Sequence, residues 1–261
     1  MQVWQPAPVR LEGVDNFRDI GGYPAGGRMM RRGLVFRSGD LARATDADLA
    51  ALHGLGIGAI IDLRRPVERE RAPSRLWPGF DARVVSSDVV DEFQDWAVAL
   101  RAVATVDAAW FERHNTETYA TLAFSPRNVW LFGECLRLLA TTERPVLMHC
   151  AAGKDRTGLL TAMLQRIAGV KMDDIVAEYL QTNAAVLTEV RMARLGTWLE
   201  TQTGHRLDAP ALTAALAVRP AYLASCFAEI DKAHGSFEGY VRDVLEVPDA
   251  FLDQIKIRLL E

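Results

Sequence analysis

The sequence predicts an α/β fold in which a central, mostly parallel sheet is flanked by helices. Three short apolar segments, at residues 33–38, 57–63 and 145–149, have the length and composition of buried strands. Helical patterns lie between them, and strands that alternate with helices usually form a parallel sheet covered on both faces.

The N-terminal elements follow from turn residues and capping signals. Glycine and proline are frequent between residues 21 and 27, which indicates an ordered loop or a short hairpin before the first strand. Thr45 and Asp48 resemble a capping box and predict a helix that ends near Gly54. The isoleucine-rich segment 57–63 is the second strand, and residues 83–86 are a further candidate.

The middle of the chain is predicted to hold a helical insertion at about residues 91–122. Ser125 followed by Pro126 is typical of a helix start, and this helix is expected to end near Ala140. Residues 145–149 then form the last buried strand.

The C-terminal half is predicted to be helical, beginning with residues 157–168 and a stop at Gly169. All of the sequence after Met172 is helical in character. Its apolar stripe around Leu195 and Leu199 is typical of core packing, with a helical lid over about residues 173–235 as the more specific interpretation. We expect residues 1–261 to form one domain.

Bulk composition limits the classes of function. The formal net charge of −4 does not favour a nucleic-acid partner. No apolar run reaches about 18 residues, and residues 1–10 lack the apolar core of a signal peptide. The three cysteines are too widely spaced for a disulfide framework or a CxxC motif. A cytoplasmic location is expected, with signal-independent export left open and no stable insertion in a membrane.

The segment from His149 to Gly158, HCAAGKDRTG, fits the pattern C-x5-R-[ST] between a strand and a helix. Such a loop can aim its backbone N–H groups at an anion, and the dipole of the following helix adds to the attraction. Arg156 can hold two phosphate oxygens at once, which a lysine cannot. Gly153 permits a backbone geometry that a Cβ atom would block. The segment therefore predicts a phosphate-binding loop.

The same positive environment is expected to activate Cys150. Cysteines at helix N-termini or beside cationic groups have a pKa of about 3.5–7.5 instead of about 8.5. We therefore expect Cys150 to be an ionised nucleophile. Other phosphate motifs fail, because a Walker loop would need glycine where Met148 stands and no Rossmann glycine pattern follows a strand.

These residues resemble the protein-tyrosine-phosphatase superfamily, and most of all its bacterial PtpB-like branch of tyrosine and lipid phosphatases. Residues 14–23, 36–39, 62–64 and 218–245 resemble that branch as well. The resemblance implies a protein-tyrosine-phosphatase-like fold with Cys150 as nucleophile and Arg156 as phosphate clamp. It also implies that Thr157 hydrogen-bonds the thiolate as it leaves the cysteinyl-phosphate and that His149 orients the loop. The implied phosphate-binding residues are Ala151, Ala152, Gly153, Lys154, Asp155, Arg156 and Thr157.

The general acid is not given by the resemblance to tyrosine-specific enzymes, which use a Trp-Pro-Asp loop. The nearest match, Trp77-Pro78-Gly79, has Gly79 in place of the acid and is interpreted as an ordinary loop. Asp155 is the first candidate, because related lipid phosphatases place an Asp there; it could instead brace the helix start or pair with Arg156. Asp62 is the second candidate, with a salt bridge to a neighbouring arginine as the alternative. Asp88 is a distant third.

Further charged residues have two interpretations each. Lys154 can add a second positive charge for the substrate, or be a solvated surface lysine. Arg18, Asp19, Arg37 and Arg64 can line the pocket or brace the N-terminal loop, and bracing is favoured for Asp19 and Arg37.

The resemblance implies a metal-independent phosphoric monoester hydrolase that forms a cysteinyl-phosphate and needs no cofactor. The expected partners are phosphorylated proteins or phosphoinositides, with phosphotyrosine preferred and specificity relaxed toward phosphoserine, phosphothreonine or phosphoinositides. A non-catalytic module that reads phosphorylated partners is the alternative, although both its nucleophile and its clamp are intact. Rhodanese chemistry is disfavoured because rhodanese loops lack the Arg-Thr-Gly ending found here. Arsenate-reductase chemistry is disfavoured because those enzymes need resolving cysteines, which the cysteine spacing here does not offer. The oligomeric state is left open.

Overall fold

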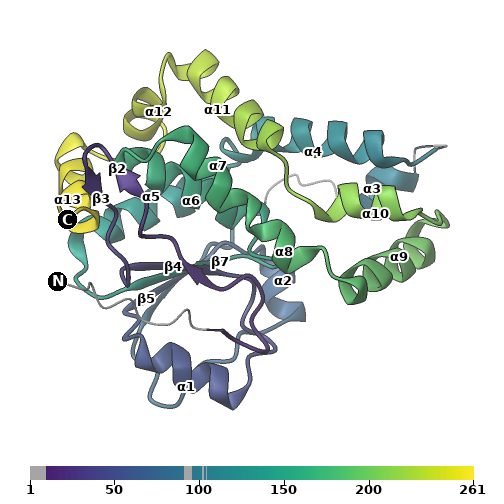
Figure 1. Cartoon of the computed structure of the whole chain (residues 1–261), viewed down its shortest axis with the longest axis horizontal. Helices are drawn as coiled ribbons and strands as arrows, with labels where there is room; N and C mark the ends of the chain where they lie inside the picture. The colour runs from purple at the N-terminus through teal and green to yellow at the C-terminus, as the bar shows by residue number, and fades with distance from the viewer. Residues whose placement is uncertain (1–9, 91–95, 102, 104) are drawn as a thin grey trace.

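The computed structural model describes residues 10–90, 96–101, 103 and 105–261. Its main sheet has five strands, in the spatial order β1 (Arg18–Asp19), β4 (Val35–Ser38), β7 (Val146–His149), β5 (Ala59–Asp62) and β6 (Arg83–Val85). Strands β4, β7, β5 and β6 are parallel, and β1 is an antiparallel edge strand (Figure 1). The prediction of a mostly parallel sheet flanked by helices is confirmed.

Strands β4, β7 and β5 end at the same level of the sheet. His149 in β7 is opposite Ser38 in β4 on one side and Asp62 in β5 on the other. The residues that follow these three strands therefore emerge side by side at the carboxyl edge, where parallel α/β sheets place their binding sites. The predicted N-terminal hairpin is the separate pair β2 (Pro24–Ala25) and β3 (Arg28–Met29).

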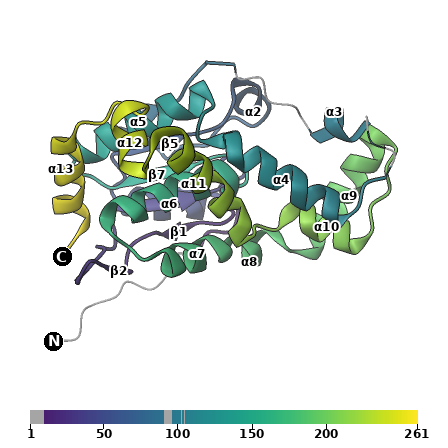
Figure 2. The ribbon, with the colours of Figure 1, turned by 90° about the horizontal axis from the view of Figure 1, so that it is seen from above.

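Helices cover both faces of the sheet and extend beyond one end of it (Figures 1 and 2). In chain order the helices are α1 (Asp46–Gly54), α2 (Pro66–Arg71), α3 (Trp96–Arg101), α4 (Ala108–Leu122), α5 (Pro126–Thr141), α6 (Asp155–Ala168), α7 (Met172–Leu180), α8 (Thr182–Val186), α9 (Glu189–Thr203), α10 (Ala209–Leu216), α11 (Pro220–His234), α12 (Phe237–Asp243) and α13 (Asp249–Leu259).

Most of the predicted helix boundaries agree with the structure. Thr45 and Asp48 form the predicted capping box of α1, and Gly169 ends α6 in a left-handed conformation with φ of 87°. Helix α6 begins at Asp155 instead of Thr157, so its first turn follows directly on the loop that is predicted to bind phosphate. The helical insertion predicted at 91–122 consists of α3 and α4, while residues 91–95, 102 and 104 lie outside the described part.

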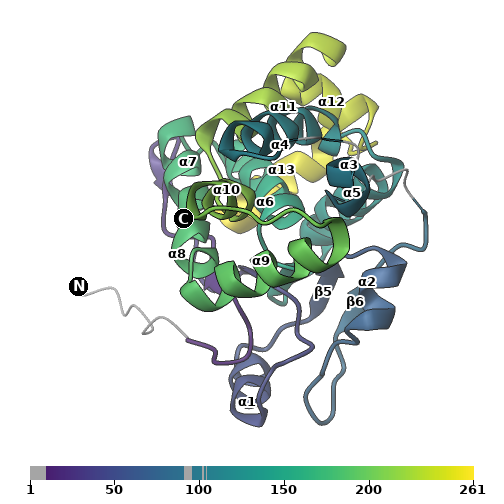
Figure 3. The ribbon, with the colours of Figure 1, turned by 90° about the vertical axis from the view of Figure 1, so that its right-hand side faces the viewer.

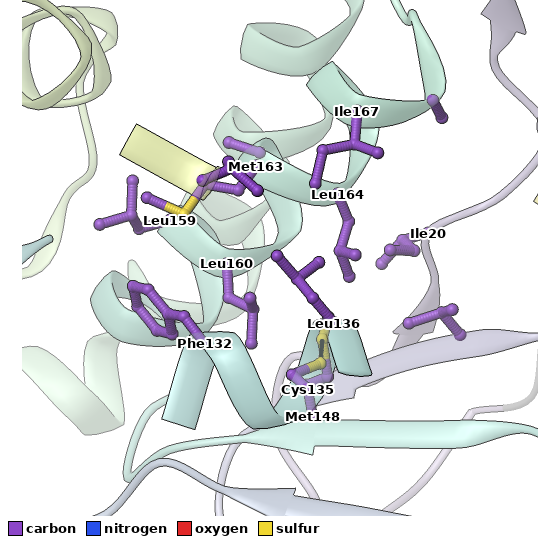
Figure 4. Close-up of a cluster of buried hydrophobic side chains, with 14 of the residues drawn as sticks. Ile20, Phe132, Cys135, Leu136, Met148, Leu159, Leu160, Met163, Leu164 and Ile167 are labelled. Atoms are coloured by element: carbon purple, nitrogen blue, oxygen red, sulfur yellow. Dashed lines mark hydrogen bonds between the residues drawn. The ribbon is translucent and has the colours of Figure 1, made fainter. Parts of the chain in front are cut away.

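The sheet separates two hydrophobic clusters because side chains alternate along each strand. Val146 and Met148 of β7 point into the larger cluster, and Leu147 between them points into the smaller one beside α1. Figure 4 shows the larger cluster, where Leu160 of α6 and Leu136 of α5 lie over Met148. Helix α6 is thus fixed on the sheet by apolar burial, which also fixes the loop that precedes it.

Helices α3, α4, α9 and α10 form a lobe beyond the carboxyl edge of the sheet (Figures 1 and 3). The lobe has its own buried cluster, which includes Leu100, Phe111 and Leu199. Of the predicted apolar stripe, Leu199 is fully buried and Leu195 packs against this cluster, whereas Trp198 is 40% exposed.

Among the described residues, no single helix is both long and apolar enough to cross a membrane. Helices α10 and α11 meet the length and composition test only when they are counted together across a bend of 42°.

Candidate active site

Residues Cys150 to Lys154 form a tight loop between β7 and α6 at the carboxyl edge of the sheet. Cys150 is buried, with 2% of its surface exposed. Gly153 has φ of 64°, and a Cβ atom there would lie 2.4 Å from the carbonyl oxygen of Ser38. Both facts require glycine, since other residues avoid this conformation and no side chain fits the space.

The carbonyl groups of the loop are held on its outer side. The carbonyl oxygen of Ala151 accepts a hydrogen bond from the amide of Asp40 at 3.1 Å. The carbonyl oxygen of Gly153 accepts from Asn16 Nδ2 and from Arg37 Nη2, both at 2.7 Å. Within the described part of the chain, the amides of Ala151, Ala152 and Gly153 donate to no other group. These donors are available to an anion, as the predicted cradle requires.

A buried ion-pair network lies behind the loop. Glu178 of α7 is 1% exposed and accepts from Arg37 Nη1 at 2.7 Å and from Arg18 Nε at 2.6 Å. Arg18 also donates to the side chain of Asn16. The network connects the N-terminal segment, β4 and α7 to the loop, so Arg18 and Arg37 act as braces. Asp19 is a brace as well, because its carboxylate accepts from the amides of Gly21 at 2.8 Å and Gly33 at 2.5 Å.

Arg156 lies in the first turn of α6 and forms a two-pronged ion pair with Glu68 of α2. Its Nη1 is 2.6 Å from Glu68 Oε2, its Nη2 is 2.8 Å from Oε1, and Nη1 also donates to the carbonyl of Leu63 at 3.0 Å. Burial opposes the charge of Arg156, but the hydrogen bonds and charge of Glu68 and the nearby Cys150 raise its pKa. The guanidinium is therefore fixed in position and fully charged.

Sequence reasoning missed Glu68. Burial favours its neutral form, but hydrogen bonds from Arg156 outweigh burial and lower the pKa of Glu68 to about 2. The sequence did contain a signal for the position of Glu68. Proline is frequent at the first position of a helix, so Pro66 after β5 indicates a helix start with Glu68 in its first turn.

Asp155 is the first residue of α6, and its side chain is 40% exposed. Its Oδ1 accepts a hydrogen bond from the hydroxyl of Tyr119 at 2.9 Å, and no described contact joins it to Arg156. Lys154 Nζ lies 3.7 Å from the same oxygen. Asp155 is thus the candidate acid that lies beside the loop with its carboxyl group accessible.

Asp62 is buried and forms the salt bridge given above as its alternative role. Its two oxygens accept from Arg64 Nε at 2.9 Å and Nη2 at 2.7 Å. Burial raises the pKa of Asp62, but His149 and Arg64 outweigh that effect and lower it. Burial also lowers the pKa of His149, whose Nδ1 lies 3.4 Å from the carbonyl oxygen of Cys150. Asp62 is therefore ionised and paired, which suits a structural role better than proton donation.

The structure also locates three other residues named in the sequence analysis. Lys154 is 6% exposed, and its Nζ donates to the carbonyl of Ala215 at 3.1 Å, so the interpretation as a solvated lysine is wrong. Asp88 pairs with Arg69 on the surface. Trp77 is 3% exposed in the smaller cluster, which fits its interpretation as part of an ordinary loop.

A cavity of about 390 Å³ opens beside the loop, between α4, α5 and the start of α6. Asp155 and Arg156 line it on the loop side. The remaining walls have an apolar part and a polar part. The apolar residues are Tyr119, Leu122, Phe124 and Pro126, and the polar ones are Asn115, Thr118, Thr121, Ser125 and Asn128 together with two more arginines, Arg65 and Arg127. A flat apolar group with an attached anion fits such a lining.

Thr157, whose hydroxyl the resemblance implies to be catalytic, follows the loop in α6. Thr157 is fully buried in the first turn of α6, two helical positions after Asp155. Its Oγ1 has no hydrogen-bond partner among the described residues. A hydroxyl in that state is available to a sulfur anion at the helix start.

Comparison with known proteins identifies one family. The model of the tyrosine phosphatase family matches residues 9–261. The triple specificity protein phosphatase PtpB of Mycobacterium tuberculosis is 33% identical over 259 residues, covering 89% of this chain and 92% of PtpB.

Two further relatives have similar names. A Cupriavidus necator protein named as a tyrosine-protein phosphatase is 33% identical over 247 residues, covering 94% of this chain and 86% of the relative. A tyrosine-protein phosphatase of Nostoc commune is 30% identical over 242 residues, with 85% and 73% covered.

Proposed function

Because the chain belongs to the tyrosine phosphatase family, we propose that this phosphatase works through a cysteinyl-phosphate on Cys150. The thiolate attacks phosphorus, so that an S–P bond forms and the P–O bond to the leaving group breaks. Asp155 gives its proton to the leaving oxygen. Water then attacks phosphorus, Asp155 takes a proton from it, the S–P bond breaks and inorganic phosphate leaves. No metal is needed for either step.

The observation that carries the proposal is the arrangement around Cys150. The loop amides donate to no described group, and Arg156 lies in the first turn of α6, whose N-terminal dipole favours negative charge. The same groups that stabilise the sulfur anion bind the three non-bridging phosphate oxygens. Arg156 is oriented by Glu68, so it adds charge without having to be ordered during the reaction.

The test is hydrolysis of 4-nitrophenyl phosphate by wild type and by Cys150→Ser. We expect the substitution to abolish turnover, and we expect denaturation during turnover to leave a phosphate adduct on the peptide that contains Cys150. Cys226→Ser is the matched control, because Cys226 is also buried but lies outside the loop. Equal background rates from wild type and Cys150→Ser would favour the alternative of a non-catalytic module that reads phosphorylated partners.

For the substrate, we propose phosphotyrosine with relaxed specificity toward phosphoserine, phosphothreonine or phosphoinositides. The apolar walls of the cavity suit an aromatic ring, and Arg65 and Arg127 offer charge to a second anionic group. The relative PtpB is named a triple specificity protein phosphatase. Turnover of phosphotyrosine peptides, phosphoserine peptides and phosphoinositides by the same preparation tests this range. Turnover of phosphotyrosine alone would remove the relaxed part of the proposal.

We further propose that the chain is one cytoplasmic phosphatase domain with α9 and α10 as part of a lid. All three cysteines are unpaired, which suits a reducing compartment. Lys154 connects the loop to α10, and Arg191 at the start of α9 pairs with Asp15. Cell fractionation tests the location. Slower hydrogen exchange in α9 and α10 when inorganic phosphate is added tests the lid, and unchanged exchange would argue against it.

A further inference from the structure

Two buried tyrosine hydroxyls form a chain that ends on the proposed acid. The hydroxyl of Tyr179 in α7 donates to that of Tyr119 in α4 at 2.6 Å, and Tyr119 donates to Asp155 Oδ1 at 2.9 Å. The direction follows from chemistry, because an ionised carboxylate only accepts. Burial raises the pKa of both tyrosines well above the ordinary value, so both hydroxyls keep their protons at neutral pH.

The position of the Tyr119 hydroxyl is fixed by packing. The ring of Tyr119 is 1% exposed and packs against Tyr222 of α11 with ring centroids 5.3 Å apart. The ring of Tyr179 contacts it from the other side at 6.3 Å. Helices α4, α7 and α11 together hold the hydroxyl in place, so the chain is a rigid donor and not a mobile surface contact.

Asp155 needs such a donor because its own side chain is 40% exposed. It lies at the first position of α6, and besides the Tyr119 hydroxyl its Oδ1 has Lys154 Nζ at 3.7 Å as a described polar neighbour. We infer that Tyr119 is the positioning residue of the general acid: its hydroxyl holds Asp155 Oδ1 and leaves Oδ2 directed at the leaving group. This inference rests on the proposed function.

The role also fixes which oxygen carries the proton. Oδ1 accepts from Tyr119 in both protonation states of the carboxyl group, so the proton that is transferred sits on Oδ2. Removing the Tyr119 hydroxyl leaves Asp155 in place but lets it rotate. Only substrates whose leaving oxygen needs a proton in the transition state then react more slowly, because nucleophile and clamp are untouched.

The experiment measures kcat/KM of wild type and Tyr119→Phe on 4-nitrophenyl phosphate, phenyl phosphate and an alkyl phosphate. We expect a change of at most about twofold for the nitrophenyl ester, which leaves as a stable anion. We expect a loss of roughly tenfold to hundredfold for the alkyl ester, the range for a hydrogen bond to a charged group. Phenylalanine keeps the buried ring, and thermal unfolding checks that the variant is folded.

Tyr222→Phe is the matched control, because its ring packs on Tyr119 while its hydroxyl accepts from Asn115 at 3.5 Å. It should keep the wild-type dependence on the leaving group. In an Asp155→Asn background, Tyr119→Phe should have no further effect, since the group it positions is gone. A purely structural role would instead lower all three rates equally and add to Asp155→Asn.

Failure of the inference differs from failure of the proposed function. An active wild type with Cys150-dependent turnover and an unchanged leaving-group dependence in Tyr119→Phe overturns only the role of Tyr119. An Asp155→Asn variant with wild-type leaving-group dependence overturns it too, because Asp155 would not be the acid. A wild type that turns over none of the three esters contradicts the proposed function itself.

Discussion

Single residues set the charge distribution of the site. Arg156 would be free to rotate at the start of α6, but Glu68 holds it from α2 at 2.6 and 2.8 Å. The pair is largely buried, with 14% and 17% of the two side chains exposed. Breaking one partner of such a pair leaves an uncompensated charge. Glu68 therefore orients the arginine that is proposed as the phosphate clamp.

Substituting Glu68 with glutamine should lower kcat/KM by about tenfold to hundredfold. The amide keeps the shape and can still accept one hydrogen bond, but it no longer offers two charged oxygens to Arg156. Steady-state kinetics with 4-nitrophenyl phosphate measures the effect. Arg83 forms a 3.7 Å surface pair with Glu134, so Glu134→Gln is the control and should leave the rate unchanged. Unchanged kinetics in Glu68→Gln would show that Arg156 orients itself.

The same ion pair predicts a pH dependence of stability. The pKa of Glu68 falls from 4.5 to about 2 on folding, so its contribution is complete above pH 4.5 and is lost as pH falls toward 2. A shift of this size corresponds to about 3 kcal/mol. Urea unfolding at several pH values should therefore show a stability difference between wild type and Glu68→Gln that shrinks below pH 4.5. A difference that stays constant down to pH 2 would contradict the assignment.

Gly153→Ala should abolish most activity while the protein still folds. The new Cβ would lie 2.4 Å from the Ser38 carbonyl, and the residue would keep φ of 64° only at a cost of about 1–2 kcal/mol. The loop backbone must then shift, and its amide N–H groups no longer point at the same bound anion. Gly79→Ala is the control, because it has φ of 71° with nothing within 4 Å of the added Cβ. Both variants strain the backbone at a positive φ, but only Gly153→Ala adds a steric clash. Measuring the activity and the thermal unfolding of both variants therefore separates the two effects.

At the scale of elements, the loop depends on α7 behind it. Glu178 compensates both Arg18 and Arg37, and Arg37 in turn holds the carbonyl of Gly153 outward. Helix α7 thus supplies the counter-charge that lets Arg18 and Arg37 act as braces. Its Tyr179 also begins the hydroxyl chain to Asp155, so α7 supports the loop and the acid together.

Glu178→Gln should reduce the free energy of unfolding by about 3–5 kcal/mol, because the buried Arg37 and the half-buried Arg18 both lose their counter-charge. Glu229→Gln is the matched control, since Glu229 pairs with Lys232 on the surface at 3.1 Å and should change stability by at most about 1 kcal/mol. Urea unfolding measures both. A Glu178 variant as stable as the control would mean that water or another group replaces the carboxylate.

At the scale of the whole molecule, the lobe of α3, α4, α9 and α10 has a core separate from that of the sheet. Lys154 donates from the loop to the end of α10, so the lobe is connected to the site by a polar contact as well as by α4. A small separate core implies that the lobe can open locally while the sheet stays folded.

Leu199→Ala should raise hydrogen exchange in α9 and α10 but leave the strands protected. Leu199 is fully buried in the lobe cluster, and such a truncation costs about 2–5 kcal/mol. Leu139→Ala, in the cluster beside the sheet, is the comparison and should weaken the whole molecule. Equal effects of both substitutions on the strands would show that lobe and sheet unfold as one unit.

The sequence by itself determined the four parallel strands and the loop between the last of them and α6, but not the antiparallel edge strand β1. Strand periodicity, the capping box at Thr45 and the glycine stop after α6 are local signals, and local signals are encoded in neighbouring residues. Cys150, Gly153 and Arg156 lie within seven consecutive positions, so their spacing alone was enough to predict that they share one loop.

Only the tertiary structure decided the partners that come from far along the chain. Glu68 meets Arg156, Tyr119 meets Asp155 and Glu178 meets Arg37 across 88, 36 and 141 residues. The same structure favoured Asp155 over Asp62, because it buried one carboxylate in an ion pair with Arg64 and left the other accessible beside the cavity. The sequence ranked Asp155 before Asp62 only through the resemblance, since the physical surroundings of each carboxylate are made by side chains that only packing brings together.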